Sequence, residues 1–144
     1  MKRIPSVKSV MTAFPFSVNA DAPLKEATEF MRQHHIHHLP VTRDGDLVGS
    51  ISDRDIQLIL GPDFAYPNPD ELTIAEVMIA NPYTVDLGER LDTVLAYMAT
   101  KHIDAAIVTR RGKLVGVFTT SDACRSFANF LREQFRRSGG GTAA

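Results

Sequence analysis

Features that mark several specialised classes of protein are rare or absent in this sequence. The 144 residues include one cysteine, Cys124, and no tryptophan. A single cysteine excludes an internal disulfide and favours a reducing compartment, so we expect a cytoplasmic protein. No apolar run approaches the roughly 20 residues that a membrane span requires. The amino-terminal stretch MKRIPSVKSV also lacks the apolar core of a signal peptide.

An excess of charge of one sign is lacking as well. Lys and Arg number 16 and Asp and Glu 17, which gives a formal net charge of −1. Nothing overall therefore steers the chain to nucleic acid or to an anionic membrane, and neither is an expected partner. With 44% hydrophobic and 23% charged residues, the composition is that of an ordinary globular protein. The length suits one compact domain or two small halves that share a core.

The sequence does contain an internal repeat. Residues 10–55 align with residues 77–122 at a constant offset of 67 positions and without a gap. The triplet Val41-Thr42-Arg43, for example, falls on Val108-Thr109-Arg110. An offset that holds over this length indicates two copies of one supersecondary unit.

Each copy has the pattern of a strand, a helix, a hairpin and a second helix. Asp21 and Asp86 are candidate N-caps of the first helix in the two copies. Asp-Gly in the first copy is a strong hairpin signal. The expected strands are residues 16–18, 39–42 and 47–51 in the first copy and residues 83–85, 106–109 and 114–118 in the second.

We expect the two copies to cover each other, because one such unit alone leaves a sheet face and a sheet edge exposed. The expected fold class is α/β, with two β-α-β-β-α motifs related by a pseudo-twofold axis in one module. A proline-rich stretch separates the copies. The expected boundaries are 1–60 for the first motif, 61–73 for the linker, 74–124 for the second motif, 125–137 for an amphipathic helix and 138–144 for a disordered tail.

Both copies end on the same motif, Gly-x-x-Ser/Thr-x-x-Asp. The hydroxyl residue lies near the start of the following helix, where unpaired backbone N–H groups and the helix dipole favour an anion. A hydroxyl group can donate to a phosphate oxygen, and a carboxylate can accept both hydroxyl groups of a ribose diol. The same spacing also describes an ordinary helix cap with an acidic first turn, so both interpretations stay open. The residues are Gly49, Ser52 and Asp55 in the first copy and Gly116, Thr119 and Asp122 in the second.

The doubled unit resembles a pair of CBS (cystathionine-β-synthase-type) motifs, known as a Bateman module. The resemblance runs from Val10 to about Asp122 and is carried by the VMT start, the HHLPV strand and the LVGSISDRD ending. It implies a regulatory, non-catalytic module that binds adenosine compounds between its motifs. The implied ligands are AMP, ADP, ATP or S-adenosylmethionine, with Mg²⁺ accompanying a nucleotide. The family also implies a homodimer that modulates a partner protein or an attached domain.

Carried over by position, the resemblance implies two symmetric sites, each built from both motifs. The hydroxyl residue and the Asp of one motif face the first strand and the segment before the hairpin of the other. One site would use Ser52 and Asp55 with Tyr83, Ile103 and Asp104. The other would use Thr119 and Asp122 with Met11, Phe16, Ile36 and His37.

The second copy departs from the family pattern in one segment. HIDAAIV stands where the first copy has HIHHLPV, so that Asp104 occupies the place of His37. An acidic side chain repels a phosphate. We therefore expect a phosphorylated ligand at the Thr119–Asp122 site, whereas the Ser52–Asp55 site stays empty or takes an uncharged tail or a cation.

Two further stretches allow other interpretations. HHIHH at residues 34–38 is a candidate metal site, but neighbouring side chains point apart where a helix joins a strand, so we expect no metal. The C-terminal stretch ACRSFANFLREQFRR forms an apolar stripe that needs cover, from its own module or from a second copy. The stripe residues are Ala123, Phe127, Phe130, Leu131 and Phe135.

Three classes of function remain in competition. The first is a stand-alone sensor of adenosine compounds. The second is a docking or dimerisation module without a ligand, which acts on an enzyme or a transporter. The third is an enzyme, and it is disfavoured because no base–nucleophile pair is found and the repeated carboxylates occupy positions suited to a ribose.

Overall fold

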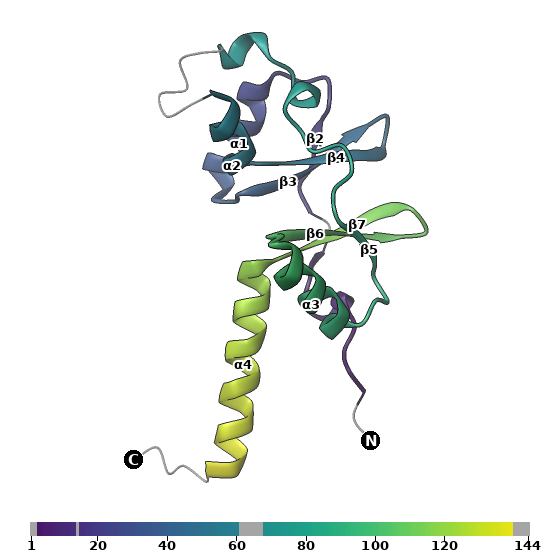
Figure 1. Ribbon diagram of the computed structural model, residues 1–144, viewed down its shortest axis with the longest axis vertical. Coiled ribbons are helices and arrows are strands. Elements are labelled where there is room, and N and C mark those ends of the chain that lie inside the picture. Colours follow the sequence, from purple (N-terminus) through teal and green to yellow (C-terminus); the bar gives the residue numbers. More distant parts are fainter. Residues whose placement is uncertain (1–2, 14, 61–67, 140–144) are drawn as a thin grey trace.

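The computed structural model describes residues 3–13, 15–60 and 68–139, which form two halves stacked one above the other (Figure 1). Both halves have the expected order β-α-β-β-α, and the predicted fold class is confirmed. The first half contains β2 (Val18–Asn19), α1 (Leu24–His34), β3 (His38–Arg43), β4 (Asp46–Ser52) and α2 (Asp53–Leu60). The second contains β5 (Thr84–Asp86), α3 (Leu91–Lys101), β6 (Ala105–Arg110), β7 (Lys113–Thr119) and α4 (Thr120–Gly139).

The two hairpins have equivalent registers. In the antiparallel pair β3–β4, Val41 lies opposite Gly49, and in β6–β7, Val108 lies opposite Gly116. The first strand of each half runs parallel to the hairpin, as β2 beside β3 and β5 beside β6. The sequence expectation for the hairpins is therefore confirmed to within one residue at each end.

The starts of the first helices differ from the sequence expectation. The N-cap of α1 is Pro23 and that of α3 is Arg90, so the prediction that Asp21 and Asp86 cap these helices is wrong. Asp21 instead forms an ion pair with Arg43, in which Nη2 and Oδ1 lie 3.0 Å apart. Asp86 closes a turn after β5, because its carboxylate accepts the N–H of Gly88 at 2.9 Å. An Asp that ends a strand can satisfy the turn rather than the helix.

The two halves exchange short segments. Strand β1 (Thr12–Ala13) precedes the first half in sequence but pairs with β7, with Thr12 opposite Val117. Ile79 precedes the second half, yet its backbone exchanges two hydrogen bonds with Ser50 of β4, at 3.0 and 2.8 Å. The cores follow the same exchange, because Val7 is buried in the second half and Ile74 in the first. Residues 7 and 74 are equivalent in the repeat, so each half is completed by the segment before the other.

Helix α4 extends away from the second half as a single rod (Figure 1). The expected boundary between residues 124 and 125 falls inside it, so the last helix of the second motif and the amphipathic helix are one. The tail expected at 138–144 starts with the last two residues of α4, and residues 140–144 lie outside the described part. So do residues 61–67 of the linker. Among the described helices, none is long and apolar enough to cross a membrane.

Candidate functional site

The repeated hydroxyl and carboxylate side chains cap the helices on which they lie. The N–H of Ser52 donates to Asp55 Oδ2 at 3.0 Å, and the N–H of Asp55 donates to Ser52 Oγ at 3.1 Å. Thr119 and Asp122 form the same reciprocal pair, at 2.9 and 3.3 Å. The capping interpretation of the motif is therefore confirmed. It does not exclude a ligand, because a carboxylate has about four acceptor positions.

The carboxylates of Asp55 and Asp122 differ in how many of their acceptor positions already have a hydrogen-bond donor. Asp122 is only 6% exposed, and its Oδ1 accepts from Arg125 Nη1 at 3.1 Å and from Thr12 Oγ1 at 3.5 Å. Asp55 is partly exposed, and within the described residues only its Oδ2 has a hydrogen-bond donor. Asp55 thus keeps acceptor capacity that Asp122 has already used.

A hollow of about 530 Å³ lies beside Asp55, between the two halves. It combines the end of β4 and the start of α2 with the segment before β5 and the segment before β6. All five residues expected at the first site line it, namely Ser52, Asp55, Tyr83, Ile103 and Asp104. A hollow of this size is in the range of small-molecule sites, which are about 300–1,000 Å³.

The hollow contains residues that the sequence analysis did not assign to it. They include His38, Arg54, Asn81 and His102. Arg54 had a signal in the sequence, since it lies between Ser52 and Asp55 in the first turn of a helix at the site. His38 had none, because its place at the hollow is apparent only once the two halves are packed together. Arg54 supplies a positive charge that partly offsets Asp55 and Asp104.

Burial sets the protonation of two rings at this hollow. Removal from water lowers the pKa of His38 below 6.5, and the nearby carboxylate of Asp104 opposes that shift only in part. Burial also raises the pKa of the Tyr83 hydroxyl above 10.0. Tyr83 stacks on Tyr97 of α3, with ring centroids 4.4 Å apart. At neutral pH the hollow therefore presents a neutral imidazole and a neutral phenol held against a second ring.

The lowered pKa of His38 predicts a dependence of stability on pH. The unfolded chain binds a proton at His38 as the pH falls through about 6.5, whereas the folded chain binds it only at a lower pH. The free energy of unfolding should therefore decrease as the pH falls from 7.5 to 5. Urea titrations of the wild type and His38→Gln across this range measure it. The variant should show a shallower loss, and equal slopes for the two chains would contradict the prediction.

The residues expected at the second site occupy several places. Met11 lies against β7, where its sulfur is the nearest atom to a Cβ built on Gly116. The Phe16 ring packs on Phe30 and His34 of α1, with centroid distances of 5.1 and 4.5 Å. Residue 14, between these two, lies outside the described part of the chain.

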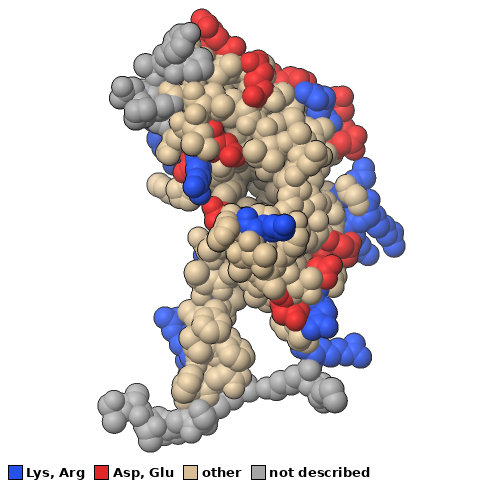
Figure 2. Space-filling view, viewed as in Figure 1, with Lys and Arg blue, Asp and Glu red and all other residues tan. Residues whose placement is uncertain are grey.

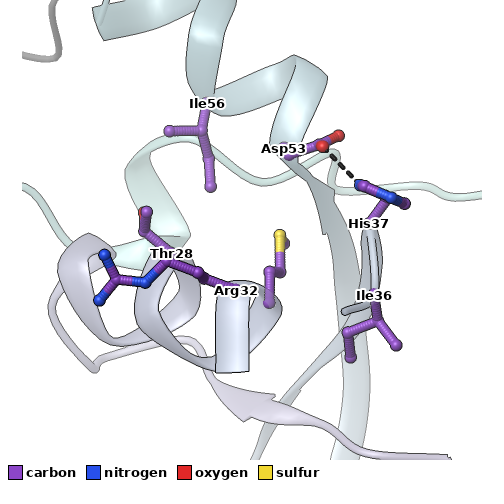
Figure 3. A pocket seen from close by; sticks show the side chains of 7 residues that line it. Thr28, Arg32, Ile36, His37, Asp53 and Ile56 are labelled. Carbon is purple, nitrogen blue, oxygen red and sulfur yellow. Dashed lines mark hydrogen bonds and ion pairs between the residues drawn. The ribbon is translucent and has the colours of Figure 1, made fainter. Parts of the chain in front are cut away.

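Ile36 and His37 line a smaller pocket between α1 and α2, of about 180 Å³ (Figure 3). His37 Nδ1 lies 2.7 Å from Asp53 Oδ2 at its edge. Thr119 and Asp122 do not line this pocket, whose other residues are Thr28, Met31, Arg32 and Ile56. The residues expected at the first site therefore surround one hollow, whereas those expected at the second site lie in separate places.

The histidines of HHIHH point to different surroundings. His34 contacts the Phe16 ring, His35 ends α1 in the left-handed conformation with φ of 54°, and His37 pairs with Asp53. His38 lines the hollow. Among the described residues, no group of three or more His, Cys, Asp or Glu side chains is arranged to hold a metal ion.

Comparison with known proteins finds a matching family model, similar sequences and similar solved structures. The family model of the CBS domain matches residues 7–61 and 74–129. A CBS domain-containing protein of Dictyostelium discoideum is 29% identical over 125 residues, which is 81% of this chain and 86% of that protein. A CBS domain pair solved in complex with 5′-methylthioadenosine and S-adenosyl-L-methionine is 29% identical. The match covers 88% of this chain and 98% of that one, with a TM-score of 0.78.

A third relative was solved with a different bound group, zinc ions. Hypoxic response protein 1, known from Mycobacterium tuberculosis, has a solved structure with two coordinated zinc ions. That structure is 29% identical and has a TM-score of 0.70, over 83% of this chain and 97% of the other. Solved structures similar to this chain thus differ in the groups that they contain.

Proposed function

The chain belongs to the CBS domain family, and from this premise we propose that it is a regulatory module that binds adenosine compounds between its two motifs. One observation carries the proposal: the hollow of about 530 Å³ beside Asp55 is lined by both halves. A ligand in it contacts β4 and α2 on one side and the segments before β5 and β6 on the other. Its binding therefore changes the free energy of the arrangement of the two halves, as a regulatory ligand must.

The lining residues suggest how an adenosine would lie. Asp55, with acceptor capacity to spare, would accept the ribose hydroxyl groups, and Ile103 would pack on the base. Acidic residues then outnumber Arg54 at the hollow, because Asp55 and Asp104 both line it. We propose an adenosine compound with an uncharged or cationic tail here, as in the solved relative with 5′-methylthioadenosine and S-adenosyl-L-methionine. A phosphorylated ligand, AMP, ADP or ATP with or without Mg²⁺, is proposed for the Thr119–Asp122 site, where the ribose hydroxyl groups would have to replace Arg125 and Thr12 as donors to Asp122 Oδ1.

The remaining parts of the proposal concern the setting of the module. It performs no chemistry and acts on a partner protein in the cytoplasm, where its single cysteine stays reduced. The competing candidate, a docking module without a ligand, is favoured by the capping roles of Asp55 and Asp122, which need no ligand.

A thermal-shift panel distinguishes the two candidates. A ligand that binds only the folded chain raises its melting temperature, by an amount that grows with the ratio of ligand concentration to Kd. The panel consists of AMP, ADP, ATP, S-adenosylmethionine, 5′-methylthioadenosine and NADH, each with and without Mg²⁺. We expect a rise with at least one adenosine compound. No rise with any of them would favour the docking module.

We also propose that the chain forms a homodimer. Phe127, Phe130 and Phe135 of α4 are 60%, 55% and 70% exposed, which is more apolar surface on one helix than a monomer usually leaves in water. Sedimentation equilibrium at micromolar concentration should give twice the chain mass of 15.9 kDa. A monomer at high micromolar concentration would contradict the proposal.

A further inference from the structure

The pocket between α1 and α2 lies within the first half. Its walls are the later turns of α1, the segment between α1 and β3, and the first turn of α2. None of its lining residues belongs to the hollow between the two halves. The adenosine site proposed above therefore does not account for it, and we call it the α1–α2 pocket.

The interior of the α1–α2 pocket is apolar. Met31 and Ile56 line it and are only 4% and 1% exposed. Ile36 lies across the pocket from Ile56 (Figure 3). The volume is about 180 Å³. An apolar cavity of about 150 Å³ is enough to hold benzene, so the pocket has room for one ring or one branched alkyl group.

Charged side chains stand at the rim of this pocket. His37 and Asp53 form a pair there, with 2.7 Å between Nδ1 and Oδ2. Arg32 is exposed and lies on the other side of the pocket (Figure 3). Within the described part of the chain, its guanidinium has neither a hydrogen bond nor an ion pair. The acidic group at the rim thus has a partner, whereas the arginine has none.

The wider surroundings of the pocket do not attract anions. Residues 18–60 and 68–79, which make up the first half, contain ten acidic residues and four Lys or Arg. Figure 2 shows acidic side chains over much of this half, at the end of the molecule opposite α4. Two of the four basic residues are in ion pairs with Asp, and a third lines the hollow. A preference of the pocket for an anion therefore depends on the fourth, Arg32, and can be tested at this one side chain.

We propose that the α1–α2 pocket binds a small apolar carboxylate, with its ring or branched alkyl group between Ile36 and Ile56 and its carboxylate on the guanidinium of Arg32. A guanidinium can present two parallel N–H donors to the two oxygens of a carboxylate. A cationic ligand is less well matched, because the one acidic side chain that lines the pocket is already paired. The proposal goes beyond the adenosine site, since it assigns a second class of ligand to a second cavity.

The internal repeat provides a comparison within the same molecule. At the offset of 67 positions, Met31 corresponds to Met98, which is likewise buried. Arg32, in contrast, corresponds to Ala99, and Asp104 stands at the position of the rim histidine. The second half thus has an acidic residue and no arginine at these positions, so we expect no carboxylate to bind beside Met98.

Methyl NMR of the chain labelled at its methionines locates the binding. Benzoate, benzyl alcohol and benzylamine are matched probes that share a ring and differ in charge. A ring in the pocket shifts the methyl signal of Met31, which Met31→Leu identifies, and leaves that of Met98 in place. We expect a saturable shift of Met31, with the tightest binding for benzoate and the weakest for benzylamine. No saturable shift with benzoate, an equal shift of Met98, or benzylamine binding as tightly as benzoate would overturn the proposal.

Substitution of Arg32 tests the charged contact. Arg32→Gln should weaken benzoate binding about tenfold, the loss expected for one charge-assisted hydrogen bond, and leave benzyl alcohol binding unchanged. Arg110→Gln is the matched control, because it removes an exposed arginine at the end of β6, and it should bind benzoate as the wild type does. Thr28→Leu, which fills part of the pocket, should weaken both probes. Equal benzoate affinity in the two arginine variants would refute the contact with Arg32, and unchanged affinity in Thr28→Leu would refute the pocket.

Discussion

Replacing Asp55 with alanine is expected to weaken binding of S-adenosylmethionine or 5′-methylthioadenosine by about tenfold to a hundredfold or more. A carboxylate that accepts two ribose hydroxyl groups forms charge-assisted hydrogen bonds, each worth roughly 1.5–3 kcal/mol. Every 1.4 kcal/mol is about a factor of ten in affinity. Isothermal titration of the wild type and the variant measures the loss.

Asp55 also caps α2, so loss of binding must be separated from loss of structure. Asp55→Asn is the matched control, because its amide oxygen can still accept the N–H of Ser52 but one acceptor and the charge are lost. We expect Asp55→Asn to retain the melting temperature better than Asp55→Ala and to lose most of the affinity. An asparagine variant that binds as the wild type does would contradict a role of the Asp55 charge in holding the ribose.

For AMP or ATP the larger loss is expected with Asp122→Ala. The two acidic groups at the Ser52–Asp55 hollow disfavour phosphate, and this argument also predicts that Asp104→His strengthens phosphate binding there. Titrations of AMP into Asp55→Ala, Asp122→Ala and Asp104→His decide the matter. Equal losses for the two alanine variants would refute the proposed difference between the sites.

The second large effect is expected at Gly49. A Cβ at this position would stand 2.6 Å from the carbonyl oxygen of Ile79 and 2.7 Å from the sulfur of Met78. The backbone of Ile79 is hydrogen-bonded to Ser50, so it cannot withdraw without breaking that pairing. We expect Gly49→Ala to destabilise the fold by about 1–3 kcal/mol, the usual cost of overpacking. It should also weaken ligand binding, because the displaced segment leads into Asn81 and Tyr83 at the hollow.

Gly116→Ala provides the matched control for this prediction. Its Cβ would stand 2.5 Å from the sulfur of Met11 and 2.9 Å from the carbonyl oxygen of Thr12. Urea unfolding should show a similar destabilisation, whereas binding at the Ser52–Asp55 hollow should be retained, because neither Met11 nor Thr12 lines that hollow. Equal loss of ligand in the two variants would mean that unfolding, and not the hollow, limits binding.

Sequence alone predicts the repeat and the hairpins, because these depend on spacing that both copies share. The residues around one hollow are given by the resemblance to CBS motifs. The starts of α1 and α3 are not predicted, since Asp21 and Asp86 satisfy a loop ion pair and a turn instead. The exchange of segments at Val7 and Ile74 is not predicted either. Each half has an equivalent place for such a segment, and no local sequence pattern indicates into which half a given segment packs.

The charge of the hollow also depends on residues that both halves contribute. Asp104 is readable from the sequence as a departure from the first copy, but its effect depends on Arg54 and His38. These residues come from the other motif and reach the hollow only when the two halves pack together. A property that arises from two halves in contact cannot be read from either copy alone.

The exchange of segments means that the two halves are not separable units. A chain cut between residues 60 and 68 would give an amino-terminal fragment that keeps the piece belonging to the second half and lacks Ile74, which fills its own core. The equivalent register of Val7 and Ile74 lets the missing piece be replaced by the same arm of another identical fragment. Two such fragments would then complete each other. The present chain thus has the layout expected if two copies of a single motif, which exchanged arms as separate molecules, became joined by gene duplication and fusion. The contact between two molecules then becomes a contact within one.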